Sequence, residues 1–154
     1  MGQQQLLLVI LVTILVGIAT VVAINVFGES AEQANADAVR QDLLAAASQA
    51  QAIYAKPRQL GGAGGDFELM DEEVLLQQLR IPGSRSTGEA TGSPVPEGVN
   101  YVENENGVYT IEVASDALTI NAIPATYRSN INLVVTWTEA TRSWGIVLDE
   151  DSAF

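Results

Sequence analysis

An uninterrupted apolar run at residues 6–27 constrains what this chain can fold into more than any other feature. The run carries no charge, and its only polar side chains are Thr13, Thr20 and Asn25. A helix over this run rises about 1.5 Å per residue and extends roughly 33 Å, close to the roughly 30 Å hydrocarbon thickness of a bilayer. A helix that is apolar all the way round needs a surround without water, so we expect lipid or other copies of the same helix.

The start of the chain differs from a cleavable secretory signal. Residues 3–5 are all Gln, and no Lys or Arg precedes the apolar run. Secretory signals have a basic start and a shorter apolar region, and conventional signal anchors carry basic flanks that set their orientation. We therefore expect either that a basic leader was removed upstream or that the segment is not a conventional anchor.

The amino-acid composition narrows the range of functions that we expect for this chain. The net charge is −12, from 7 Lys and Arg against 19 Asp and Glu, and every charged side chain lies at Glu29 or later. An acidic surface argues against nucleic-acid binding, which needs a basic face. The chain has no Cys and no His, so it lacks thiolate chemistry and the commonest general base and metal ligand. No enzymatic activity, cofactor or metal is predicted.

An amphipathic stretch at residues 31–55 follows the apolar run. Apolar side chains recur every three or four residues, which is typical of a helix with one buried face. The helix should end at Lys56-Pro57, because the residue before a proline is pushed out of the α region. If it continues through Gly28, it is about 50 residues and roughly 75 Å long. The expected stripe consists of Val39, Leu43, Ala46 or Ala47, Ala50 and Tyr54.

The middle of the chain, residues 57–99, is predicted to be a loop region with one short helix. The glycine-rich residues 61–65 indicate a turn, because no P-loop context surrounds them. Residues 71–80 have acids in the first turn and Arg at the end, as the helix dipole favours. Residues 82–96, rich in Gly, Ser, Thr and Pro, predict a surface loop.

The last third alternates with a period of two. Strands are predicted at residues 100–103, 108–113, 117–123, 130–138 and 143–148, with Asn106-Gly107 as a hairpin signal between the first two. These form an antiparallel meander of four or five strands, whose apolar face needs the amphipathic stripe as its cover. Trp137 and Trp144 are expected to be core or cross-strand partners. The fold class is α+β.

Two acidic clusters are the remaining candidates for chemistry. Asp71, Glu72 and Glu73 are more simply explained as acids at a helix N-terminus. Asp149, Glu150 and Asp151 lack the shaped loop of six or more oxygens that Ca²⁺ needs, so a solvated tail at the surface is expected.

The layout resembles that of a type IV pilin. The chain has a short polar start, an apolar helix from the sixth residue, an amphipathic continuation, a loop region and a C-terminal antiparallel sheet. Residues 50–67 also resemble the end of the long helix and the following loop in some bacterial pilins. The resemblance implies an apolar helix at residues 1–28 and a globular pilin domain at 29–154. That domain comprises a helix half at 29–56, a loop region at 57–99 and a sheet at 100–148.

The resemblance also implies processing, with two departures from the family pattern. In pilins a prepilin peptidase cuts after a Gly, the new N-terminus is methylated, and the fifth mature residue is usually Glu. Here the processed residue would be Met1, which puts Gln5 in fifth place, or Gln3, which puts Leu7 there. Pilins often break the helix with a Pro near residue 22. This chain has none there, which leaves Gly17 as the candidate for an unwound stretch or for close helix approach.

By this resemblance, the chain is expected to polymerise with copies of itself into a surface filament that serves adhesion, motility or related roles. A pool would wait in the inner membrane before the pilus assembly machinery extracts it. The alternatives are a type II secretion pseudopilin or minor pilin, an archaeal-type pilin or archaellin, and a monomeric membrane-anchored extracytoplasmic binding domain. The expected filament-core contacts are Gln5, Leu6, Leu7, Leu8, Ile10, Leu11, Ile14, Leu15, Gly17, Ile18, Val21, Val22, Ile24 and Phe27.

Overall fold

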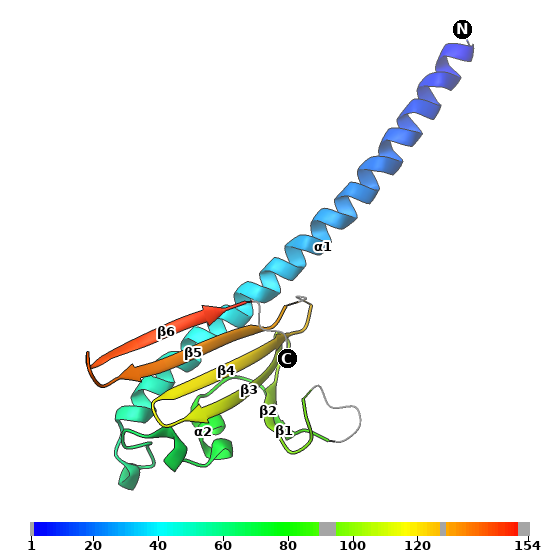
Figure 1. Cartoon of the computed structure of the whole chain (residues 1–154). Helices are drawn as coiled ribbons and strands as arrows, with labels where there is room; N and C mark the ends of the chain where they lie inside the picture. Colours follow the sequence, from blue (N-terminus) through cyan, green and yellow to red (C-terminus); the bar gives the residue numbers. More distant parts are fainter. Residues whose placement is uncertain (1, 90–94, 127–128, 151–154) are drawn as a thin grey trace. The chain divides into compact units, whose positions relative to one another are not determined.

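The computed structural model describes residues 2–89, 95–126 and 129–150 (Figure 1). The chain divides into two compact units, Met1–Ala34 and Asn35–Phe154. Helix α1 (Gly2–Ala55) supplies every described residue of the first unit and the opening segment of the second. It continues through Gly28, as expected, and ends immediately before Lys56-Pro57.

The glycine-rich turn caps the C-terminus of α1. The last carbonyls of a helix have no partner within it. Here the backbone N–H of Ala63 donates to the carbonyl of Ile53 at 2.9 Å, and that of Gly65 donates to the carbonyl of Tyr54 at 2.9 Å. The predicted turn is confirmed, and the structure shows that it satisfies helix carbonyls that Pro57 leaves without continuing partners.

Glycine is required in this turn for two separate reasons. Gly61 and Gly64 have φ values of 79° and 67°, which other L-residues rarely adopt. Gly62 is needed for space, since a Cβ there would lie 2.1 Å from the carbonyl oxygen of Lys56. The 3-10 helix η1 (Arg58–Leu60) fits between α1 and this turn.

The predicted short helix is confirmed as α2 (Glu72–Gln78), preceded by the 3-10 helix η2 (Phe67–Leu69). Asp71 is its N-cap and accepts a hydrogen bond from the backbone N–H of Glu73 at 2.9 Å. An N-cap carboxylate satisfies one of the free donors at a helix start. The acids at 71–73 therefore begin a helix, as expected from the sequence.

The sheet contains six antiparallel strands in chain order, which confirms the α+β fold class and the meander (Figure 1). The expected number of four or five strands was too low. The additional strand lies inside the stretch predicted to be a loop, where a Ser- and Thr-rich segment with no apolar alternation pairs along the edge of β2. The strands are β1 (Ser84–Thr87), β2 (Asn100–Glu103), β3 (Gly107–Ala114), β4 (Ala117–Pro124), β5 (Ile131–Thr138) and β6 (Ser143–Asp149).

The hairpin between β2 and β3 lies where Asn106-Gly107 predicts it, but its glycine has another role. Gly107 is the first residue of β3 and has no positive φ. A Cβ at Gly107 would lie 2.3 Å from the carbonyl oxygen of Ile123 on β4, so close strand approach requires glycine here. The side chain of Asn104 shapes the turn instead, accepting from the backbone N–H groups of Asn106 at 2.9 Å and Gly107 at 3.0 Å.

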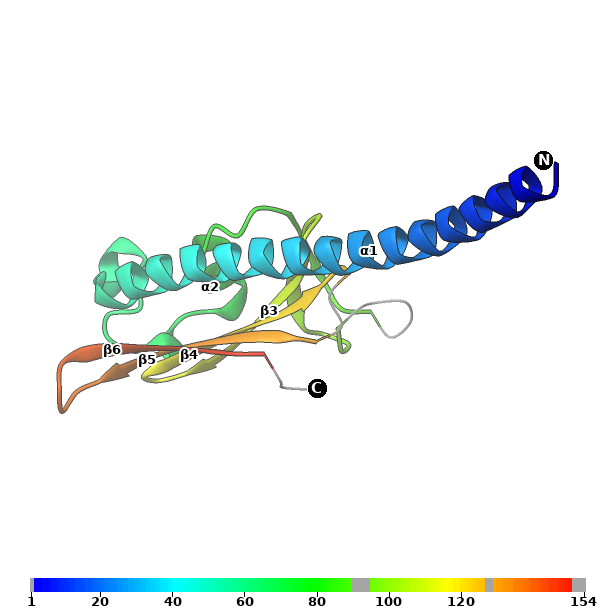
Figure 2. The same ribbon diagram turned by 90° about the horizontal axis from the view of Figure 1, so that it is seen from above.

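The hydrophobic core of the second unit forms between α1 and one face of the sheet (Figure 2). The predicted stripe is confirmed, because Val39, Leu43 and Ala50 have no exposed surface and Tyr54 is 8% exposed. Both Ala46 and Ala47 are buried, so the two alternatives for that position are both part of the core. Among the sheet residues that complete this core are Tyr109, Ile111, Leu118, Ile120, Ala122, Ile131, Leu133 and Val135.

An aromatic cluster closes the same core near the end of α1. Trp137 on β5 and Trp144 on β6 are directly paired across the strands, with ring centroids 5.2 Å apart. Tyr54 meets Trp144 edge-on at 5.1 Å and Phe67 at 5.0 Å. The prediction that the two tryptophans are cross-strand partners is confirmed.

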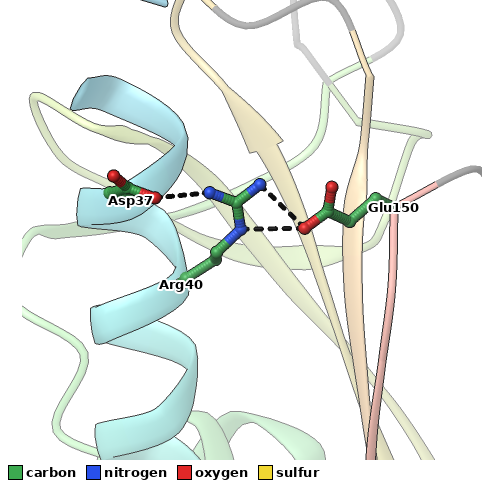
Figure 3. Close-up of polar contacts among 3 residues, drawn as sticks. All are labelled: Asp37, Arg40 and Glu150. Atoms are coloured by element: carbon green, nitrogen blue, oxygen red, sulfur yellow. Dashed lines mark hydrogen bonds and ion pairs between the residues drawn. The ribbon is translucent and has the colours of Figure 1, made fainter. Parts of the chain in front are cut away.

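The sequence predicts a solvated acidic tail, but in the structure one of its acids, Glu150, pairs with Arg40 of α1. Arg40 of α1 donates from Nε and Nη2 to Oε1 of Glu150 at 2.8 and 2.7 Å and also pairs with Asp37 (Figure 3). The hydrogen bond to Glu150 raises the pKa of Arg40 above its ordinary value. Asp151 lies outside the described residues.

Candidate functional site

The candidate functional site is the apolar surface, which we define as residues 6–27 of α1. Its residues lie in the first compact unit, and all of them are exposed. Leu6, Leu7 and Leu8 are 63%, 67% and 62% exposed, and Phe27 is 75% exposed. Successive residues of a helix point about 100° apart, so three exposed leucines in a row place apolar side chains around its whole circumference.

The described part of the chain contains one helix that is long and apolar enough to cross a membrane, and it is α1. An 18-residue window of α1 has a mean hydropathy of 3.1, and none of it is buried. Length and composition alone are weak support for a membrane span. The exposure of this window distinguishes it from the core helix of a soluble protein, which is mostly buried.

Two of the three polar side chains in the apolar surface are satisfied inside the helix. The hydroxyl of Thr13 donates to the carbonyl oxygen of Val9 at 2.7 Å, and that of Thr20 donates to the carbonyl oxygen of Val16 at 2.8 Å. A hydroxyl without a partner is costly to move out of water. Both threonines can therefore enter an apolar surround without leaving an unpaired hydroxyl donor.

All residues expected to form filament-core contacts, from Gln5 to Phe27, lie exposed on α1. Gln3 lies in the first turn of the same helix, and that first turn contains no acidic residue. Met1 lies outside the described residues. In this structure of the single chain, α1 is helical at Gly17. A Cβ on Gly17 would meet no atom within 4 Å.

The residues of α1 in the second unit include polar anchors that the sequence alone did not reveal. Asn35 donates through Nδ2 to the carbonyl oxygen of Asn106 at 2.8 Å and accepts from the backbone N–H of Thr126 at 3.2 Å. These bonds join the helix to the β2–β3 turn and to the segment that follows β4. The only sequence signal was an Asn interrupting an alanine-rich stretch, which does not name its partners.

Asp42 makes a second anchor on the same hairpin. Its Oδ2 accepts from Tyr109 at 2.8 Å, from Asn106 at 2.9 Å and from Asn104 at 3.2 Å. Three donors on one carboxylate oxygen, together with a phenol that has almost no exposed surface, make this a structural contact rather than a reactive one. Burial is the main cause that raises the pKa of Tyr109, and Asp42 raises it further.

Within residues 2–89, 95–126 and 129–150, no group of three or more His, Cys, Asp or Glu side chains is placed to hold a metal ion. The first unit presents an exposed apolar helix segment, and the second unit has a covered hydrophobic core of its own.

Compared with models of known protein families, with curated proteins and with solved structures, the chain has no significant match. The fold is compatible with a pilin-like architecture, since a long helix with an apolar N-terminal part packs its later residues on an antiparallel sheet.

Proposed function

We propose that this chain is the structural subunit of a type IV pilus-like surface filament, held together by bundling of the apolar surfaces of many copies. The observation that carries the proposal is the complete exposure of residues 6–27 on a helix whose later residues are built into a folded domain. The hydrophobic core of the second unit is buried, and the apolar surface on residues 6–27 takes no part in it.

The driving force for assembly follows from that exposure. Full burial of a Val, Leu, Ile or Phe side chain contributes about 1.5–3 kcal/mol, so a run of this length gains tens of kcal/mol of gross burial. Association and side-chain ordering offset a large part of this gain. Contacts that repeat head to tail without closing produce a helical filament rather than a ring.

The same surface supports a membrane-inserted pool before assembly. Lipid and a bundle of like helices both exclude water, and the hydroxyls of Thr13 and Thr20, which already donate to helix carbonyls, need no further acceptor in either. The charged side chains, all at Glu29 or later, remain in water in both states. By the family resemblance, a prepilin peptidase and a pilus assembly machinery would act on the chain, with Met1 or Gln3 as the processed residue.

The missing acid near the N-terminus requires a different local contact. The first turn of α1 holds Gln3, Gln4 and Gln5 and no carboxylate. Glutamine amides donate and accept, so these side chains can bond to one another or to an N-terminal amine of a neighbouring copy. The contact would be uncharged on the glutamine side, and hence less sensitive to salt than an ion pair.

A second function uses the same helix as a single membrane anchor for an extracytoplasmic binding domain. The observation that favours it is the presence of just one helix in the described chain with the length and hydropathy to span a bilayer. A pseudopilin or minor pilin is the intermediate case, with the same architecture and a short envelope-bound assembly.

The experiment is electron cryo-microscopy of material sheared from the cell surface. The filament proposal expects thin filaments that contain this chain and have a core of bundled helices into which residues 2–55 fit. Recovery of the chain only with the envelope, in short assemblies, would favour the pseudopilin. Recovery only as a detergent-solubilised monomer would refute polymerisation and leave the anchored domain.

A further inference from the structure

A cleft of about 670 Å³ opens beside β3. Residues 110–113 of β3 line it together with Glu72 at the start of α2 and residues just before β2, all within the second unit. Strand β2 and the N–H of Phe67, which donates to the Ser115 carbonyl at 3.1 Å, occupy the neighbouring main chain of β3. Side chains therefore determine what the cleft can recognise. Its volume is in the range of about 300–1,000 Å³ that is usual for small-molecule sites.

One wall of the cleft is apolar. Val95, Pro96 and Val99 line it from the segment before β2, and Ile123 lines it from β4. Val95 is buried in the smaller of two hydrophobic clusters, while Val99 and Ile123 pack against that cluster and are only partly buried. The cleft therefore leaves apolar surface that a ligand can cover. A wall of branched and cyclic side chains is broad, so it fits a ring or a branched hydrocarbon better than a thin linear chain.

Thr110 contributes a hydroxyl without a partner. The residue is 5% exposed, and its hydroxyl forms no hydrogen bond with any residue that the structure describes. Asn121 lies directly opposite on β4, but its amide donates to Glu112 instead. Buried polar groups are normally paired, because an unpaired one costs free energy. Since Thr110 lines the cleft, the contents of the cleft are the available source of that partner.

The charge of the cleft is negative. Among the described residues that line it, the ionisable ones are Glu72 and Glu112, with no Lys or Arg. Oε1 of Glu112 accepts from Nδ2 of Asn121 at 3.0 Å, and Asn121 is 4% exposed. A buried amide thus holds this carboxylate in place, which reduces the ordering cost of a contact with a cation. Thr110 and Glu112 are two positions apart on one strand, so their side chains share a face of the sheet.

We propose that this cleft binds a small organic cation, a primary amine carried on a bulky apolar body. The ammonium group donates to the Glu112 carboxylate and to the Thr110 hydroxyl, which accepts as well as donates. Glu72 adds a second negative charge from α2, and the apolar body lies against the valine and proline wall. A lysine side chain of a partner protein offers the same ammonium group on a thin unbranched chain, so the wall favours the free amine. The proposal does not depend on filament formation.

The test uses the full chain in non-ionic detergent micelles, with benzylammonium chloride as the probe. An NMR titration of the backbone amides measures binding and identifies the residues involved, and empty micelles correct for partition of the probe. We expect saturable binding with a dissociation constant of about 0.1–10 mM, the range for so small a ligand, and the largest shifts at Val99, Thr110 and Glu112.

Three related compounds test what the cleft recognises. Benzyl alcohol keeps the ring without the charge, benzoate reverses the charge, and methylammonium lacks the ring. Each should bind at least about tenfold more weakly than benzylammonium, because each loses either the charge-assisted hydrogen bonds or the apolar contact.

Thr110→Val tests the hydroxyl. It should weaken benzylammonium binding about tenfold, the effect of losing one hydrogen bond to a charged group. It also removes a buried hydroxyl without a partner, so the melting temperature of the ligand-free chain should stay the same or rise. Thr136→Val makes the same change on β5, outside the lining of the cleft, and should leave affinity unchanged. Weaker binding without loss of stability separates a binding role from a structural one.

Charge variants test the recognition of the cation. Glu72→Gln and Glu112→Gln should each weaken binding about two- to fivefold, the effect of losing one exposed ion pair. Glu105→Gln in the β2–β3 turn makes the same charge change outside the cleft and should leave affinity unchanged. Glu72 takes no part in the Asn121 bond, so its variant remains informative if Glu112→Gln disturbs folding.

Several results would overturn the proposal. Absence of saturable binding, or equal binding of benzyl alcohol or benzoate, would show that the cleft does not select an organic cation. Equal binding of methylammonium would indicate attraction to the acidic surface alone. Equal or tighter binding of N-acetyl-lysine methylamide would assign the cleft to a lysine side chain of a protein. Unchanged affinity in Thr110→Val, or a lower melting temperature, would show that its hydroxyl is not waiting for a ligand.

Discussion

The phenolic hydroxyl of Tyr109 on β3 donates to Oδ2 of Asp42 on α1 at 2.8 Å. Tyr109 has no exposed surface, and Asp42 collects two further donors from the β2–β3 hairpin. This pair is therefore the polar centre of the interface between helix and sheet, surrounded by apolar core residues.

Removing the two partners of this bond should have unequal effects. Tyr109→Phe leaves Asp42 with both asparagine donors, and we expect a loss of about 1–2 kcal/mol in the free energy of unfolding. Asp42→Ala leaves the Tyr109 hydroxyl and the Asn106 amide without their acceptor and should cost more, about 2–4 kcal/mol. Urea unfolding of the full chain in detergent, followed by tryptophan fluorescence, measures both. Equal losses would show that Asp42 satisfies only the tyrosine.

Alkaline pH should destabilise the domain through the same tyrosine. Burial, and then Asp42, raises the pKa of Tyr109 in the folded state well above its ordinary value of about 10. From about pH 10 upward the unfolded chain releases the phenolic proton while the folded chain keeps it, so the free energy of unfolding falls as pH rises. Tyr109→Phe should flatten this fall. Burial also raises the pKa of Tyr54, which should leave a smaller residual slope in the variant.

The ion pair between Arg40 and Glu150 should contribute little. The two side chains are 29% and 40% exposed, and pairs in such settings are worth about 0.2–1 kcal/mol. Glu150→Gln should therefore lower the free energy of unfolding by less than about 1 kcal/mol, with the difference shrinking in 0.5 M salt. Glu105→Gln is the matched control and should cost nothing. A loss above about 2 kcal/mol would mean that Glu150 has a larger role in closing the sheet against the helix.

Gly62 should be intolerant of even one added methyl group. Its Cβ would lie 2.1 Å from the Lys56 carbonyl oxygen, so Gly62→Ala must displace the turn that caps α1. We expect a loss of about 1–3 kcal/mol, measured by thermal unfolding. Gly145→Ala on β6 is the control, because its nearest neighbour, the Thr136 carbonyl oxygen, is 3.9 Å away. A neutral result for Gly62→Ala would show that the turn relaxes freely.

A substitution at Gly17 distinguishes the filament proposal from the single-anchor proposal. In the single chain a Cβ at Gly17 meets open space, and leucine favours helix more than glycine does, so Gly17→Leu should leave membrane levels unchanged. Small residues allow close approach between packed helices, so the same change should reduce the yield of sheared filaments severalfold. Val16→Leu enlarges the neighbouring apolar residue and should have a smaller effect. Unchanged filament yield in Gly17→Leu would show that no helix approaches closely at this position.

Much of the architecture could be predicted because it follows from local patterns. The stripe from Val39 to Tyr54 has helical periodicity, Pro57 marks its end, and Trp137 and Trp144 sit at matching positions of neighbouring strands. Strand β1 could not be predicted, since Ser84–Thr87 is fully exposed and has no apolar alternation. Its pairing depends on the edge that β2 presents, which is a tertiary property.

The polar contacts were beyond sequence reasoning for a similar reason. Asp42 meets Tyr109 across 67 positions of sequence, and Asn35 meets Asn106 across 71. The sequence around either member of such a pair gives no indication of its partner. Gly107 shows that even a correct local prediction can miss the cause. The hairpin signal located the turn, but glycine is required there because β4 approaches closely. The apolar surface was read from composition alone, and its exposure is the part that required a structure.

The chain-order arrangement of β1 to β6 bears on how quickly the domain can form. Every strand pairs with its sequence neighbour, so the sheet can grow one hairpin at a time, and the connections from β2 to β6 are short. The contacts that join α1 to the sheet span far greater sequence separations and must form later. The helix, made first at the ribosome, therefore has to wait with its stripe uncovered until β3, β4 and β5 have been synthesised.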